Sequence, residues 1–131
     1  MGFYSKVTIM AQPKAYEMIM DSIKEFNKTS SWTMNPSSTK KGNIESIGEF
    51  YILHWGWTKW YLCFEDVQSV ESVLEKLRLD HDEEEGFGYK KVILNEDNST
   101  GESTNMMDLD SYLYPVCDVK LDIGNAVLEE V

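Results

Sequence analysis

Arginine, histidine and cysteine are scarce in this chain, and their scarcity excludes several kinds of site. Arg78 is the single arginine among 131 residues, which disfavours bidentate recognition of phosphate. The two histidines, His54 and His81, stand in no CxxC or HxxxH arrangement, so no zinc site is predicted. The two cysteines, Cys63 and Cys117, are expected to be buried thiols of a cytosolic protein.

Long apolar runs and catalytic motifs are also lacking. No window holds the 18 apolar residues of a membrane span, and the N-terminus lacks a signal-peptide pattern, so a cytoplasmic protein without membrane contact is expected. No GxSxG, Walker or HExxH motif occurs, and the acidic run that starts at Asp80 lacks the glycine and glutamate positions of a calcium loop. The sequence therefore predicts no enzyme, no cofactor and no metal.

The negative charge is concentrated in the second half of the chain. Residues 1–64 contain seven lysines and five acids, a net charge of +2. Residues 65–131 contain five basic residues and 18 acids, a net charge of −13, and the two halves sum to −11. Because nucleic acids are bound by lysines and arginines that displace counterions from phosphate, direct nucleic-acid binding is excluded for the second half.

Two segments near the N-terminus carry regular periodicities. Residues 3–11 alternate between two faces and are rich in β-branched side chains, which predicts a strand. Pro13 suits the first turn of a helix, because its missing N–H is not needed there. The apolar residues that follow recur at steps of four, four and three and predict a helix that ends near Asn27; they are Ala15, Ile19, Ile23 and Phe26.

The middle of the chain changes from polar to strongly apolar. Residues 28–46 are rich in Ser, Thr, Asn, Lys and Gly, which indicates a loop or a weak hairpin arm carrying Trp32, with its turn at residues 40–43. Residues 47–64 predict a strand with two apolar faces. Such a strand is expected to be covered on both sides, or covered on one side and used for binding on the other.

The second half is predicted to hold one helix and two strands. The helix spans residues 66–79, with Asp66 as its cap and an apolar stripe of Val67, Val70, Leu74 and Leu77. Residues 89–94 predict a strand, residues 95–105 a polar loop, and residues 117–123 a half-exposed strand at a sheet edge.

This order predicts a single α+β domain over residues 1–131. The expected architecture is a two-layer sandwich, in which two helices pack on one face of a mixed or antiparallel sheet. The specific arrangement expected is the split βαβ, or ferredoxin-like, topology.

Tryptophans supply the first candidate site. Strand alternation is expected to place Trp55 and Trp57 on one face and His54 and Trp60 on the other, where Trp60 and His54 would anchor a partner. Gly56 in the strand interior predicts a bulge or a close approach by another group. The alternative is that these aromatic side chains only pack the core.

An acidic run supplies the second candidate site. It is either a solvated loop or an electrostatic surface that steers a basic partner. The candidate partner-binding acids are Asp80, Asp82, Glu83, Glu84 and Glu85.

Three segments resemble small uncharacterised accessory proteins encoded by phages and mobile elements of Gram-positive bacteria. They are FYSKVTI at residues 3–9, WGWTKWY at residues 55–61 and GYKKVILNED at residues 88–97. The resemblance implies a role in neutralising host defences, as anti-CRISPR proteins do, some by presenting negative surfaces in place of nucleic acid. It assigns no catalytic or binding residue.

The expected function is therefore that of a non-enzymatic protein-binding module. Its acidic second half would dock on a basic host protein, such as a CRISPR effector or another nucleic-acid-binding or defence protein, in the host cytoplasm. Two alternatives stay open: a small-ligand or peptide binder that uses the aromatic strand, and a homodimer joined through that strand.

Overall fold

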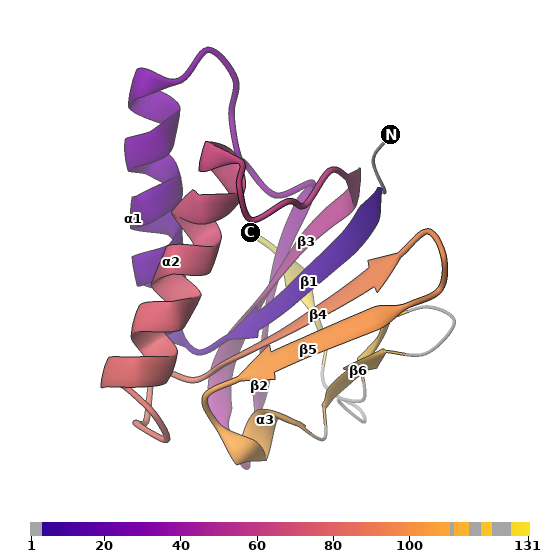
Figure 1. The fold of residues 1–131 in the computed structure, drawn as a ribbon. Helices are drawn as coiled ribbons and strands as arrows, with labels where there is room; N and C mark the ends of the chain where they lie inside the picture. The colour runs from indigo at the N-terminus through magenta and orange to yellow at the C-terminus, as the bar shows by residue number, and fades with distance from the viewer. Residues whose placement is uncertain (1–3, 111, 116–118, 122–126) are drawn as a thin grey trace.

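The computed structural model describes residues 4–110, 112–115, 119–121 and 127–131 (Figure 1). Its helices are α1 (Pro13–Thr29), α2 (Glu65–Asp80) and α3 (Met107–Asp110). Its strands are β1 (Ser5–Ala11), β2 (Ser38–Ile44), β3 (Gly48–Thr58), β4 (Tyr89–Asn95), β5 (Thr100–Thr104), β6 (Leu113–Pro115), β7 (Val119–Leu121) and β8 (Glu129–Glu130). No helix among these residues is long and apolar enough to cross a membrane.

Six of the described strands form one antiparallel sheet in the order β5-β4-β1-β3-β2-β8. The strands β1 and β2, which α1 joins, are separated by β3, as the split βαβ arrangement requires. Both long helices lie side by side on one face of this sheet (Figure 1). The predicted two-layer α+β sandwich is confirmed. That the chain has a ferredoxin-like fold stays a prediction. The two strands at the edges of the sheet, β5 and β8, were not predicted from the sequence.

The main core lies between the two helices and the sheet. The α1 stripe of Ala15, Ile19 and Ile23 is fully buried, and Pro13 occupies the first turn as predicted. The predicted stripe of α2 is buried against the same core. Burying each of the valine, leucine and isoleucine side chains in these stripes stabilises the fold by about 2 kcal/mol. The helical periodicity therefore determines which helix faces meet the sheet.

A second apolar cluster covers the opposite face of the sheet. The sheet contributes Met10, Phe50, Ile52 and Val92, and the chain after β5 contributes Met106, Leu109 and Leu113. The strand β3 is therefore covered on both sides, which was the first of the two possibilities for this strand. The second face is closed by α3 and β6 rather than by a long helix (Figure 1).

Two segments predicted to be loops or turns are strands. Residues 40–43 lie within β2 and not in a turn, and the chain reverses instead at residues 45–47. Residues 100–104, predicted to be polar loop, form β5. The strand β2 pairs with β3 and β5 pairs with β4 through backbone hydrogen bonds. Because the backbone makes these bonds, β2 and β5 need no alternation of apolar side chains.

Several predicted boundaries were wrong. The strand β3 ends at Thr58 rather than residue 64, and α1 continues past Asn27 to Thr29. Asp66 is not the cap of α2, because it lies in the first turn, where its Oδ1 accepts a hydrogen bond from the backbone N–H of Val67 at 2.9 Å. The strand predicted at 117–123 includes β7, whereas residues 117, 118, 122 and 123 lie outside the described residues.

Candidate functional site

Carboxylates from three separate segments line one hollow, which we call the acidic hollow. It has a volume of about 420 Å³ and lies where the β2–β3 turn, the loop after α2 and the start of α3 meet. Its acidic side chains are Glu45, Glu83, Glu85 and Asp108. Its other lining residues are Gln12, Ser46, Ile47, Gly48 and Met106. Only Glu83 and Glu85 were predicted as site residues.

The loop of residues 81–88, here called the acidic loop, is held from behind by Asn105, which is 2% exposed. The Asn105 Nδ2 donates to the carbonyl oxygens of Leu77, His81 and Phe87 at 3.2, 3.3 and 2.9 Å. Its Oδ1 accepts from the backbone N–H of Tyr89 at 2.8 Å. One buried amide therefore connects the end of α2, the acidic loop and the start of β4.

Gln12 holds the same loop from the side of β1. Its Oε1 accepts hydrogen bonds from the backbone N–H groups of Gly86 and Gly88 at 2.9 and 3.0 Å. Glu83 has a φ of +57°, which costs an L-residue about 1 kcal/mol. Its backbone N–H donates to the backbone carbonyl oxygen of Asn105 at 2.8 Å, and its Oε1 accepts from the N–H of Met107 at 2.9 Å. The backbone that carries the acids is therefore fixed in position.

The three remaining predicted acids lie beside the acidic hollow rather than in it. Asp80 is the last residue of α2, and Asp82 is exposed in the acidic loop. The Glu84 Oε2 lies 2.7 Å from the Nδ1 of His81, whose ring stacks on Phe87 with 4.0 Å between centroids. The predicted run thus presents its carboxylates around one end of the molecule.

Trp60, which was predicted to be a partner-binding anchor, is buried in the structure. It is 7% exposed, lies in the main core and has its ring centroid 5.2 Å from that of Trp55. Its Nε1 donates to the Oε2 of Glu71 at 3.5 Å. The chain leaves the sheet at Thr58, so the strand alternation used to place Trp60 does not extend to it.

His54 also lies away from the acidic hollow. It is half-buried in the middle of β3, where its Nδ1 is hydrogen-bonded to the Thr8 Oγ1 at 2.9 Å. The strand β3 begins beside the acidic hollow and ends beside the loop that carries Trp60 (Figure 1). Its 11 residues span roughly 30 Å, so the structure does not bring the predicted anchors and acids together.

The predicted bulge at Gly56 is confirmed. Between the pairs Val7–Trp55 and Ser5–Thr58, β3 contains one residue more than β1. An extra residue reverses the alternation of side chains, so Trp55 is 4% exposed and Trp57 is 51% exposed. The prediction that these two tryptophans share a face was therefore wrong.

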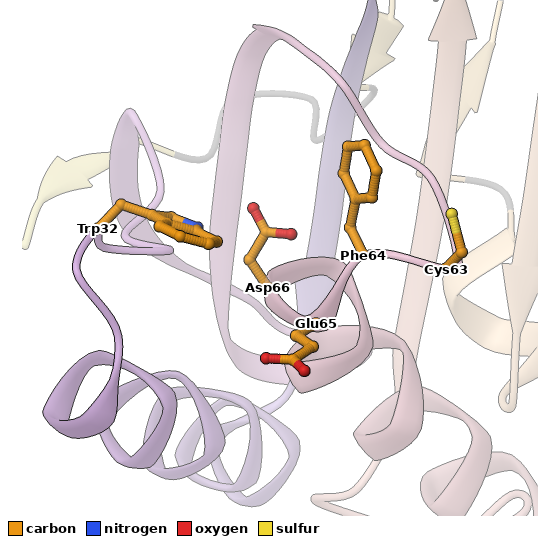
Figure 2. Close-up of a pocket in the computed structure, with 5 residues that line it drawn as sticks. All are labelled: Trp32, Cys63, Phe64, Glu65 and Asp66. Carbon is orange, nitrogen blue, oxygen red and sulfur yellow. The ribbon is translucent and has the colours of Figure 1, made fainter.

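A second hollow lies at the other end of the molecule, where α2 begins. We call it the aromatic hollow; its volume is about 480 Å³ (Figure 2). Its lining residues are Trp32, Cys63, Phe64, Glu65 and Asp66. Cys63 is an exposed free thiol, which corrects the prediction that it is buried, and Cys117 lies outside the described residues.

Sequence reasoning missed Glu45, Asp108, Gln12 and Asn105. Their only sequence signal is a polar side chain beside a turn or at the end of an apolar strand, which many surface residues share. No group of three or more His, Cys, Asp or Glu side chains in the described part of the chain is arranged to hold a metal ion. Comparison with protein-family models, curated proteins and solved structures gives no match for this chain.

Proposed function

We propose that this protein is a non-enzymatic protein-binding module that docks its acidic end on a basic surface of a partner protein. The acidic end comprises the acidic hollow and the exposed carboxylates of Asp80, Asp82 and Glu84 beside it. The partner class that fits is a protein whose lysines and arginines contact nucleic-acid phosphates, such as a host defence effector.

The observation that carries the proposal is the convergence of four carboxylates from three segments on one hollow. Neighbouring like charges repel one another, so such an arrangement is unfavourable for the isolated fold. Asp80 is the last residue of α2 and the other acids follow it, at the end of the helix where the macrodipole disfavours negative charge. The stability of α2 therefore gives no reason for these carboxylates. Glu83 bonds the Met107 N–H and Glu84 contacts His81, but a basic partner accounts for the cluster as a whole.

The rigid support of the acidic loop also favours binding. The Asn105 side chain fixes the backbone before Glu85, at His81. The Asn105 and Gln12 side chains fix it after Glu85, at Phe87 and Gly86 respectively. A surface that is already ordered loses less conformational entropy when a partner docks, so more of the electrostatic attraction appears as affinity. Clustered charge of one sign additionally raises the association rate at low salt.

A variant that neutralises the acidic end without changing its shape tests the proposal. Its substitutions are Glu45→Gln, Asp82→Asn, Glu85→Gln and Asp108→Asn. The control carries the same change in charge on exposed residues elsewhere: Glu17→Gln, Asp21→Asn, Glu49→Gln and Glu129→Gln. Both variants and the original protein serve as bait in a cell lysate at low and at high salt, and proteins retained by the original but not by the acidic-end variant are purified.

Association rates with the purified partner then decide the question. We expect the acidic-end variant to associate about tenfold more slowly than the control at low salt, and high salt to reduce this difference. An oligonucleotide that the partner binds should compete with the original protein. Equal association rates for the two variants at low salt would show that the acidic end does not steer docking.

A further inference from the structure

The aromatic hollow exposes aromatic surface that the fold does not use. Trp32 is 56% exposed and Phe64 is 39% exposed, although both lie beside well-packed helices. The Trp32 indole and the Phe26 ring form a T-shaped pair, at 6.1 Å between ring centroids. Figure 2 shows the hollow opening between the Trp32 indole and the Phe64 ring. Two aromatic walls of one concave site therefore face solvent.

Negative charge lies between these aromatic walls. Figure 2 shows the Asp66 carboxylate between Trp32 and Phe64, with Glu65 on the turn of helix just below. Among the described residues, no lysine or arginine lies within salt-bridge distance of either carboxylate. The N-terminus of α2 contributes about half a positive charge, which offsets only part of two carboxylates. The aromatic hollow is therefore negative overall.

The other exposed aromatic side chains at this end differ, because the chain covers them with its own cations. The Nζ of Lys6 lies 5.0 Å from the ring centroid of Trp57, and the Nζ of Lys59 lies 5.8 Å from that of Tyr4. No such cation lies over Trp32 within the part of the chain that the structure describes. The aromatic hollow thus lacks a cation over its Trp32 ring, whereas the rings of Trp57 and Tyr4 each have one.

We propose that the aromatic hollow binds an arginine side chain of a partner protein. A guanidinium group is planar and weakly hydrated, so its face can stack on the Trp32 indole while its edge donates to the carboxylates of Asp66 and Glu65. A lysine ammonium lacks the flat face and is more strongly hydrated, so it binds less well. This site lies at the opposite end from the acidic hollow and does not depend on it.

Short peptides and NMR spectroscopy test the proposal on the full chain. The probe is acetyl-Gly-Arg-Gly-amide, and the matched probes contain lysine or glutamine in place of arginine. We expect the arginine peptide to shift the Trp32 indole N–H and the backbone amides of residues 64–67 in a saturable way. The lysine peptide should shift the same signals less, and the glutamine peptide should leave them in place. Shifts with the glutamine peptide as large as those with the arginine peptide would overturn the proposal. Shifts confined to residues 81–88 would also overturn it, because they would show binding at the acidic end instead.

Two paired variants separate the aromatic hollow from the overall charge. Glu65→Gln with Asp66→Asn keeps the acceptor for the Val67 N–H and should abolish the shifts. Glu17→Gln with Asp21→Asn, which changes exposed residues of α1, should retain them. If both pairs respond alike, the carboxylates of the hollow do not hold the guanidinium group.

The Cys63 thiol provides an independent reading of the local charge, because it lines the same hollow and is exposed. A cationic and an anionic methanethiosulfonate reagent are compared for their rates of labelling, and mass spectrometry assigns the label to Cys63. The rate of each reagent with Cys63 is divided by its rate with a free thiol. We expect this relative rate to be about fivefold higher for the cationic reagent than for the anionic reagent. The ratio should fall toward one in the Glu65→Gln, Asp66→Asn variant; a ratio that this variant leaves unchanged would contradict the proposal.

Discussion

The side-chain oxygen of Asn105 accepts a hydrogen bond of 2.8 Å from the backbone N–H of Tyr89, and this contact closes the acidic loop at the point where β4 begins. The Asn105 amide nitrogen donates to carbonyl oxygens on the other side of the same loop. Replacement of Asn105 by alanine would remove the hydrogen-bond partner of the Tyr89 N–H and of the Phe87 carbonyl oxygen. The carbonyl oxygens of Leu77 and His81 would each keep a backbone N–H donor. We expect Asn105→Ala to lower the free energy of unfolding by about 3 kcal/mol, measured by urea denaturation.

Hydrogen exchange distinguishes this role from a general loss of stability. The amide of Tyr89 loses the Asn105 Oδ1 as its acceptor, so it should exchange faster in Asn105→Ala than the reduced global stability alone allows. The amides of the acidic loop should follow it, because the loop loses its side-chain support at His81 and Phe87. Asn43→Ala is the control, since Asn43 is exposed in β2, and it should change stability by less than about 0.5 kcal/mol. Uniform acceleration of all amides would contradict a local role for Asn105.

Trp60 and Trp57 should respond in opposite ways to truncation. Trp60 is buried against Trp55, so Trp60→Leu removes ring contacts that no rearrangement replaces and should destabilise the fold by about 3 kcal/mol. Trp57→Leu removes a half-exposed ring and should cost less than about 1 kcal/mol. Thermal and urea unfolding of both variants measure the difference. Equal losses would mean that Trp57 is also part of the core.

Helix and strand positions could be predicted where burial follows local periodicity. The stripes containing Ile19 in α1 and Leu74 in α2 repeat every three or four residues because one side of each helix meets the sheet. The strands β1 and β4 are apolar because both are interior to the sheet. For these elements the sequence pattern and the tertiary environment agree.

The polar strands could not be predicted in the same way. The strands β2 and β5 lie toward the margins of the sheet and contain mostly Ser, Thr, Lys, Gly and Glu. Their backbone groups pair with β3 and β4, and this pairing stabilises a strand whose own side chains show no apolar alternation. The position of Trp57 was missed for a related reason, because the bulge beside Gly56 reverses the side-chain alternation on which the prediction relied.

The acidic end was only partly visible in the sequence. Glu83 and Glu85 belong to one continuous run, whereas Glu45 and Asp108 reach the same hollow from the β2–β3 turn and from α3. Nothing in the spacing of these residues along the chain indicates that they meet. Their convergence depends on sheet order and on the packing of α3 beneath the sheet, which local patterns do not encode.

Gly88 is expected to be intolerant of a side chain. A Cβ at this position would lie 2.8 Å from the Met106 Sδ and 2.9 Å from the Gln12 Oε1. The methionine can move, but Gln12 can retreat only by giving up its hydrogen bonds to the acidic loop. Gly88→Ala should therefore destabilise the protein by about 2 kcal/mol in urea denaturation.

Gly56→Ala is the matched control for this substitution. A Cβ at Gly56 would meet only the Ser37 Oγ at 3.7 Å, which is ordinary van der Waals contact. Alanine also loses less backbone entropy than glycine on folding, so Gly56→Ala should leave stability unchanged or raise it by a few tenths of a kcal/mol, on the order of the usual glycine-to-alanine gain. A large loss at Gly56 together with tolerance at Gly88 would contradict the packing described for the acidic loop.

Lys90 predicts how stability changes at alkaline pH. Its side chain is 1% exposed and forms ion pairs with Asp110 and Glu102. Burial by itself would lower the pKa of Lys90, but the hydrogen bonds to Asp110 and Glu102 outweigh this effect and raise the pKa above the usual 10.5. A lysine whose pKa is raised by folding stabilises the native state fully below the unfolded value, and this contribution is lost as pH rises through the folded value.

Two tyrosines act in the same direction, so the Lys90 contribution must be isolated. Burial raises the pKa of Tyr16 and of Tyr89 above 10.0, and each therefore also lowers stability once the unfolded chain begins to ionise above that pH. We expect the free energy of unfolding, measured in urea from pH 8 to strongly alkaline pH, to fall more steeply in the original protein than in Lys90→Met. The variant retains the loss due to the tyrosines but has no ammonium group to deprotonate. Parallel curves for the two proteins would mean that the ion pairs of Lys90 do not favour its charged form, and α3 would then be held to the sheet by apolar packing alone.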